Sequence, residues 1–259
     1  MRTIALAVLM YGALASCPDT TGAAPLAAFR PAKERFTLHE PIYVEFTVEN
    51  TEDREIKIDL GKNRKGCFLF DVVGPDGTQH NNLRLQDWGA GSAGVTSVAP
   101  GETYRQQVLL NEWFTFTEAG DYNVLGRVDG GSPSSLLIRI EPRDEKTLHL
   151  VCRDLVQRIL QAEGYRQDEV TRGLSYVEDP VAIPYIASIL HASIPSQYLL
   201  VRTLQRIGTP DAVEVLISAL KSRDEDVRKL ARNTLSRMAE QTTHEAARDR
   251  IRSALRGDP

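Results

Sequence analysis

Two stretches of the chain, Asp179-Pro180-Val181-Ala182-Ile183 and Thr209-Pro210-Asp211-Ala212-Val213, are alike and lie 30 residues apart. Apolar residues around them recur at offsets of 30 or 31: Leu174, Val177, Ile186 and Leu190 match Leu204, Ile207, Leu216 and Leu220, and Leu204 and Ile207 in turn match Leu235 and Met238. Such a repeat is typical of proteins that stack similar supersecondary units. In both stretches an Asp or Thr precedes a Pro, a pair that favours the start of a helix, because the polar side chain caps exposed amides and Pro fits the first position. Each unit is therefore predicted to consist of two short helices.

These units resemble HEAT repeats, in particular the short HEAT-like repeats first described in phycobilin lyases. The resemblance extends from Gln167 to Met238, and its period of 30 or 31 residues is shorter than the HEAT and armadillo period of about 40 to 47. It implies a helical solenoid, and a last helix from Glu245 to Leu255 is expected to cap the stack. It does not imply bilin chemistry, because such repeats also occur as plain scaffolds and no catalytic motif of that family is matched.

In the part of the chain before residue 143, apolar residues recur at every second position, as they do in β-strands. From Ile42 to Val48 apolar and polar residues alternate, which is typical of a half-buried strand. Similar alternation predicts further strands around these residues: Ile56, Ile58 and Leu60; Phe68, Phe70 and Val72; Tyr104, Gln106, Val108 and Leu110; Tyr122, Val124 and Val128; Leu136, Ile138 and Ile140. Short strands separated by turns indicate a sandwich of antiparallel sheets.

Gly120-Asp121-Tyr122 precedes the second-last predicted strand, where immunoglobulin-like domains often place a tyrosine corner. Residues 26–142 therefore resemble the immunoglobulin-like domains of exported bacterial proteins, although the paired cysteines of antibody domains are missing. The predicted fold is an antiparallel immunoglobulin-like β-sandwich followed by a short α-helical HEAT-like solenoid over residues 143–259. The period changes near Pro142-Arg143, where Leu148, Val151, Leu155, Ile159 and Leu160 are predicted to form one face of a helix. We expect the two halves to be separable there.

The N-terminus has the features of an export signal. The apolar run from Ile4 to Leu14 follows a single basic residue, Arg2, and as a helix it would rise about 16 Å, too little to cross a bilayer. Leu14-Ala15-Ser16-Cys17 resembles the lipobox of bacterial lipoproteins, which implies a signal peptide at residues 1–16, lipidation of Cys17 and a linker at residues 17–25. The alternative is an ordinary secretory signal cut after Ala15.

The composition is that of a globular protein, with 42% hydrophobic and 25% charged residues. The net charge of -4 argues against a nucleic-acid partner. Apart from Cys17, the chain contains Cys67 and Cys152, which either form a disulfide between the halves or remain two buried free thiols.

Motifs for catalysis are weak. Residues 89–94 spell GxGxxG, but they lie among predicted strands, where neither a dinucleotide turn nor a nucleophile at Ser92 is expected. The histidines are never spaced as metal ligands. Trp88 and Trp113 are either binding anchors or sandwich core, and core is favoured for Trp113. We therefore expect no enzyme activity, no cofactor and no metal.

Arginines form the strongest functional signal. Arg172 matches Arg202 at an offset of 30, Arg206 matches Arg237 at 31, and Arg232 lies nearby. On the second helix of each unit these residues are expected to form two short ladders on the concave surface, suited to an acidic protein segment. The alternative is a solvated face paired with acids such as Asp224, Glu225 and Asp226.

The sequence thus predicts a non-enzymatic protein of the bacterial cell envelope, anchored by lipid and facing the periplasm or the cell surface. Its helical repeats would be a scaffold for another protein, and the membrane would be contacted through the lipid anchor alone. The alternative is an inhibitor or regulator of an envelope enzyme, acting through the sandwich loop from Asn81 to Ala99.

Overall fold

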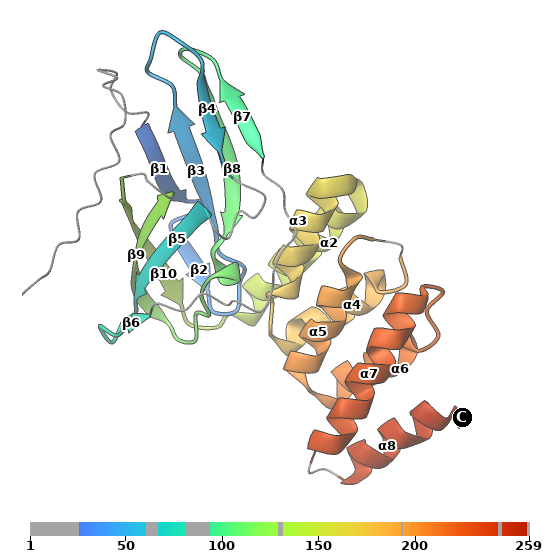
Figure 1. Cartoon of the computed structure of the whole chain (residues 1–259). Coiled ribbons are helices and arrows are strands. Elements are labelled where there is room, and N and C mark those ends of the chain that lie inside the picture. Colours follow the sequence, from blue (N-terminus) through green and yellow to red (C-terminus); the bar gives the residue numbers. More distant parts are fainter. Residues whose placement is uncertain are drawn as a thin grey trace, which may run out of the picture.

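The computed structural model describes residues 26–60, 67–80, 94–128, 132–192, 194–242 and 245–257. The chain forms an antiparallel β domain followed by a helical domain, as predicted (Figure 1). The last strand ends at Glu141 and the first long helix begins at Glu145. The change of hydrophobic period at Pro142-Arg143 thus coincides with the change from strands to helices.

Two sheets make up most of the β domain. The larger sheet has the order β2-β10-β9-β5-β6 and the smaller one the order β1-β3-β8. A separate ribbon pairs β4 with β7 beyond the ends of β3 and β8 (Figure 1). The strand bounds are β1 (Leu26–Pro31), β2 (Arg35–Thr37), β3 (Tyr43–Glu49), β4 (Ile56–Asp59), β5 (Phe68–Val73), β6 (Gln79–His80), β7 (Val95–Val98), β8 (Thr103–Leu109), β9 (Gly120–Val128) and β10 (Ser134–Glu141). Among the described strands all pairs are antiparallel except β2 with β10, which is parallel.

The core of the β domain lies between the two sheets. Val44, Phe46 and Val48 of β3 are buried, as the alternation predicted. The Phe46 ring lies 5.0 Å from the Phe68 ring of the opposite sheet in an edge-to-face contact. Trp113 is only 2% exposed, and its indole Nε1 donates to the Phe68 carbonyl at 3.1 Å. Trp113 is therefore a core residue.

Tyr122 at the start of β9 makes the contact of a tyrosine corner. Its ring is buried, and its hydroxyl donates to the Glu118 carbonyl at 3.0 Å. Burial raises the pKa of this hydroxyl, so it remains a donor. The tyrosine thereby fixes the loop that leads into β9.

Within the described residues the helical domain contains three pairs of helices and a last helix. The bounds are α2 (Glu145–Gln161), α3 (Gly164–Ser175), the short 3-10 helix η2 (Pro180–Ala182), α4 (Ile183–Ile189), α5 (Gln197–Ile207), α6 (Pro210–Ala219), α7 (Glu225–Gln241) and α8 (Glu245–Arg256). A further 3-10 turn, η1 (Leu110–Glu112), lies in the β domain. The pairs are α2 with α3, α4 with α5, and α6 with α7, so that the repeated residues Leu174, Leu204 and Leu235 lie on the second helix of each pair. Helix α8 covers the free end of the stack (Figure 1).

The repeated Asp-Pro and Thr-Pro pairs start helices as predicted. The Asp179 carboxylate accepts from the Val181 amide at 3.0 Å, and the Thr209 hydroxyl accepts from the Ala212 amide at 3.4 Å. The repeated residues Leu174, Leu204 and Leu235 are fully buried. The leucines that recur with the sequence repeat are therefore core residues of the helical stack.

One face of α2 differs from the prediction. Leu160, which was predicted on the apolar face, is 61% exposed, whereas Cys152, which was not, is buried beside Leu155 and Ile159. These three buried residues are spaced by 3 and 4 along the helix, which keeps them on one side, whereas Leu160 is rotated out of that stripe. Cys152 and Cys67 are both free thiols. Burial, with a contribution from the charge of Asp179, raises the pKa of Cys152 to about 12.

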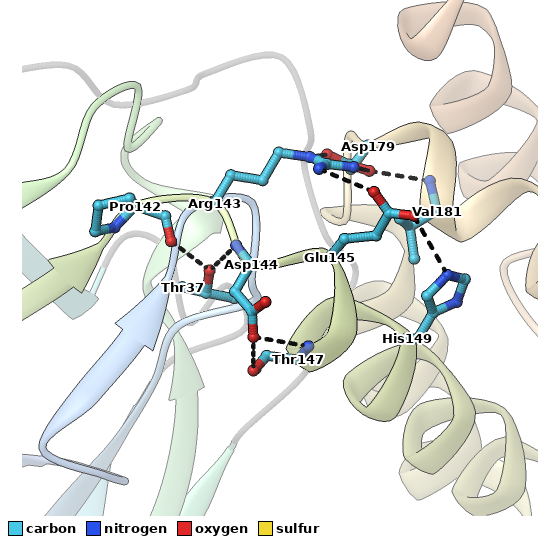
Figure 2. A network of polar contacts seen from close by, with 9 residues as sticks. All are labelled: Thr37, Pro142, Arg143, Asp144, Glu145, Thr147, His149, Asp179 and Val181. Atoms are coloured by element: carbon cyan, nitrogen blue, oxygen red, sulfur yellow. Dashed lines mark hydrogen bonds and ion pairs between the residues drawn. The ribbon is translucent and has the colours of Figure 1, made fainter.

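A polar network ties the two domains together at the junction (Figure 2). The Arg143 guanidinium donates to Asp179 with Nε at 2.6 Å and Nη2 at 3.0 Å. Thr37 of β2 donates to the Pro142 carbonyl at 2.9 Å and accepts from the Asp144 amide at 2.8 Å. Asp144 in turn caps α2 by accepting from the Thr147 amide. The junction at which the sequence predicts separable halves is thus hydrogen-bonded to both domains.

The β domain also packs directly on α3. The Tyr43 hydroxyl lies so close to the backbone of Gly173 that a Cβ at this position would be 1.9 Å from its oxygen. Glycine is therefore required at residue 173 unless the Tyr43 ring moves.

Candidate binding groove

A groove of about 1140 Å³ is lined by residues of α5, α6, α7 and α8. Helices α7 and α8 lie at the end of the stack away from the β domain (Figure 1). We call this groove the α5–α8 groove. Four arginines line it, Arg202 and Arg206 from α5, Arg237 from α7 and Arg250 from α8. The apolar part of the lining consists of Pro210, Val213, Met238, Ala246, Ala247 and Ile251. Among the described residues no aspartate or glutamate lines this groove.

The helical repeat explains why the arginines gather there. Arg202 and Arg206 are four residues apart on α5 and share one face, while Leu204 between them is buried in the core. Arg237 holds the equivalent place to Arg206 one unit later, two residues after the buried Leu235. Equivalent positions on stacked helices line one surface.

Arg202 and Arg237 are exposed on the groove surface. The Arg202 guanidinium carbon lies 5.7 Å from the centre of the Tyr198 ring, one turn earlier on α5. Arg237 donates to the side-chain amide oxygen of Gln205 at 3.4 Å, across from α7 to α5. These contacts with a neutral ring and a neutral amide orient the Arg202 and Arg237 guanidinium groups on the groove surface.

Besides lining the groove, Arg206 connects two helices of the stack. Its Nε lies 2.9 Å from a carboxylate oxygen of Glu178, and its Nη2 donates to the Ser175 carbonyl at 2.9 Å. Ser175 is the last residue of α3, whose terminal carbonyls lack partners within the helix. Arg206 therefore joins α5 to the end of α3, and a cation is favourable there because the carboxyl end of a helix carries partial negative charge.

Arg250 was not predicted as a site residue. It makes two contacts with Glu214 of α6, from Nε at 2.8 Å and from Nη2 at 2.9 Å. This hydrogen bond lowers the pKa of Glu214, which stays ionised at neutral pH. Arg250 belongs to the capping helix and has no equivalent in the earlier repeats, so the repeat gave no signal for it.

Two of the predicted arginines do not line the groove. Arg172 is only 8% exposed and its Nε lies 2.9 Å from Asp168, so the expected outward orientation is wrong for this residue. The first repeat packs against the β domain, where the charge of Glu112 also acts on Arg172. Arg232 lies on the side of α7 toward the end of α8, where its Nη1 donates to the Leu255 carbonyl at 3.5 Å.

Several other predicted features lie outside the described residues: Cys17, Trp88, Ser92, and residues 81–93 of the loop to Ala99. Within the described ranges no group of three or more His, Cys, Asp or Glu is arranged to hold a metal ion.

Residues 183–259 match the family model of HEAT repeats. This match covers α4 to α8 and therefore the whole α5–α8 groove, although it is less than half of the chain. The protein thus has an antiparallel β domain followed by a helical region, and residues 183–259 of that region match HEAT repeats.

No curated protein matches the chain. Among solved structures it is similar to the CARDB domain of the PF1109 protein from Pyrococcus furiosus, at 14% identity over 48% of this chain and 100% of that one, with a TM-score of 0.27. It is also similar to Spo0M, the sporulation control protein of Bacillus subtilis, at 14% identity over 54% of this chain and 55% of that one, with a TM-score of 0.26. A β-glucosidase from Erythrobacter marinus matches at 14% identity over 45% of this chain and 16% of that one, with a TM-score of 0.26. At these TM-scores no functional argument follows.

Proposed function

We propose that this protein is a lipid-anchored scaffold of the bacterial cell envelope that binds an acidic segment of another protein in the α5–α8 groove. The observation that carries this proposal is the lining of the groove, in which Arg202 and Arg237 flank apolar side chains and no described carboxylate takes part. Guanidinium groups donate to carboxylates in pairs, and apolar surface between them adds burial. The function is that of a binding protein and requires no catalysis.

The anchoring part of the proposal is supported by the sequence Leu14-Ala15-Ser16-Cys17. Within the described residues no helix is long and apolar enough to cross a membrane. The β domain then lies between the lipid and the helical stack, as a spacer or an adhesion domain.

The groove is tested by photocrosslinking in the membranes of the producing cells. A benzoylphenylalanine at Gln241, which lines the groove, should crosslink to protein segments rich in Asp and Glu, identified by mass spectrometry. The same group at Gln157, which is exposed on α2, is the matched control. The double variant Arg202→Ser, Arg237→Ser should lose these crosslinks, and added salt should weaken them, because screening acts on exposed charges.

A second control distinguishes binding by Arg202 and Arg237 from a general effect of positive surface charge. Replacing Arg223 and Arg252, two exposed arginines outside the groove, by Ser should leave the crosslinks unchanged. The proposal fails if the crosslinked proteins are the same with and without Arg202 and Arg237, or if Gln241 crosslinks to no protein.

A further inference from the structure

A second groove lies beside strand β8, between the β domain and the first two long helices. Its volume is about 780 Å³, within the range of about 300–1,000 Å³ that ligand sites occupy. Its lining includes β8, the end of α2 and the start of α3. We call it the β8 groove.

The backbone of β8 is open on the side away from β3. The Leu110 amide donates to the Ile42 carbonyl at 2.8 Å, and the Glu102 carbonyl accepts from the Asn50 amide at 3.0 Å. Even-numbered residues of this strand therefore face β3, and since antiparallel pairing alternates, odd-numbered residues such as Arg105 and Gln107 point their N–H and C=O groups away from it. In the described part of the chain no strand pairs with that side, because β8 is the last strand of its sheet. Both residues line the β8 groove.

The charges of the β8 groove are mainly positive. Arg105 of β8, Arg158 of α2 and Arg166 of α3 are all exposed and line it, and Glu169 is the acidic residue among the lining. Arg158 also lies 3.6 Å from Asp154, but both side chains are largely exposed, and such pairs neutralise little.

We propose that the β8 groove binds an extended acidic peptide segment, which adds to β8 as a further strand. The outward N–H and C=O groups of β8 supply the backbone pairing of strand addition. The three arginines select a segment that carries Asp or Glu side chains. This site is separate from the α5–α8 groove and does not depend on the function proposed for it.

The probe is a short fluorescein-labelled peptide of alternating Thr and Glu, titrated with the purified full chain and followed by fluorescence anisotropy. We expect saturable binding that weakens with salt, and none for the matched peptide of alternating Thr and Lys. The triple variant Arg105→Glu, Arg158→Glu, Arg166→Glu should bind at least about tenfold more weakly. Every chain in these titrations also carries Arg202→Ser and Arg237→Ser, so that the α5–α8 groove does not contribute to the signal. In that background the further exchange Arg223→Ser, Arg252→Ser, at exposed arginines that line neither groove, should leave peptide binding unchanged.

Strand addition is tested by Gln107→Pro, which removes an outward N–H and no bond to β3, a place where an edge strand tolerates proline. This variant should bind at least about tenfold more weakly than its control Gln107→Thr. A Thr-Glu peptide methylated on every backbone nitrogen should not bind, which tests the pairing even if the proline disturbs the fold. The proposal is overturned if the Thr-Glu peptide does not bind, if the Thr-Lys peptide binds equally, or if the methylated peptide binds as well as the plain one.

Discussion

At the scale of single residues, Asp179 is central to the domain junction. Its carboxylate accepts from the Arg143 guanidinium on one side and caps η2 through the Val181 amide on the other (Figure 2). Burial by itself raises the pKa of this carboxyl, but the hydrogen bonds from Arg143 and Val181 outweigh burial, and the pKa is lowered overall.

Replacing Asp179 by Asn should therefore destabilise the protein in a pH-dependent way. Because the folded-state pKa lies below the usual value of about 3.9, the carboxylate stabilises the fold above that pH and loses this effect as the pH falls through the folded-state pKa. At pH 7 we expect a loss of about 1–3 kcal/mol in the free energy of unfolding, measured with urea. At pH 3 the gap to the unmodified protein should be smaller.

The control is Asp154→Asn, since Asp154 is largely exposed and its ion pair with Arg158 spans 3.6 Å. It should change the stability by less than about 0.5 kcal/mol at either pH. An equal gap for Asp179→Asn at pH 7 and pH 3 would contradict the role of the ionised carboxylate.

The sequence did not distinguish Arg172 from Arg202, because the two residues occupy equivalent positions in the repeat. Arg202 lies on an open face of the stack, whereas the same place in the first unit is covered, so that Arg172 is buried against Asp168. The repeat predicts which side of a helix a residue occupies. It cannot predict which neighbour covers that side, because the β domain is far away in the sequence.

At the scale of helices, Arg206 links two repeats, so the arginines of the groove are not equivalent in their effect on folding. Arg206→Ser removes charged hydrogen bonds to Ser175 and Glu178. We expect it to lower the free energy of unfolding by about 1–2 kcal/mol. Arg202→Ser should change it by less than about 0.5 kcal/mol, because it alters an exposed side chain.

Thermal and urea unfolding of the two single variants measure this difference, with circular dichroism at the helix band as the signal. Equal stability of Arg206→Ser and Arg202→Ser would show that the contacts of Arg206 do not stabilise the stack. For this reason the binding test above leaves Arg206 in place.

Long elements with a regular period were predictable, and short or distant pairings were not. Strand β3 has three buried residues at alternate positions, so its local pattern identifies it. Strand β2 has three residues, and its parallel pairing with β10 joins parts of the chain about a hundred residues apart. The same holds for the contact of Tyr43 with Gly173, which no local pattern records.

At the scale of the whole molecule, the anchor at Cys17 is expected to keep the protein on a membrane. Each buried methylene of an acyl chain contributes about 0.8 kcal/mol, and two or more chains make the attachment stable. Cys17→Ala should move the protein from the membrane pellet to the soluble fraction in detergent-free buffer. If this variant still sediments with membranes, the lipid anchor is excluded as the cause.

The linker restricts where an anchored protein can act. Residues 18–25 span at most about 29 Å when fully extended, so the β domain would lie near the bilayer. Helices α7 and α8, which help to line the α5–α8 groove, lie at the end of the helical stack away from that domain (Figure 1). An anchored protein would therefore hold these two helices farther from the lipid than the β domain.

The helical stack is closed at both ends, by the β domain beside α3 and by α8, which buries Ile251 and turns charged residues outward. Between these ends the units share one period, so a duplicated unit inserted before α5 would leave both caps unchanged. Neighbouring helices pack about 8–10 Å apart, and each inserted unit would therefore lengthen the binding surface by about that distance. Gene duplication could thus adjust how long a ligand this architecture accommodates without rebuilding either end.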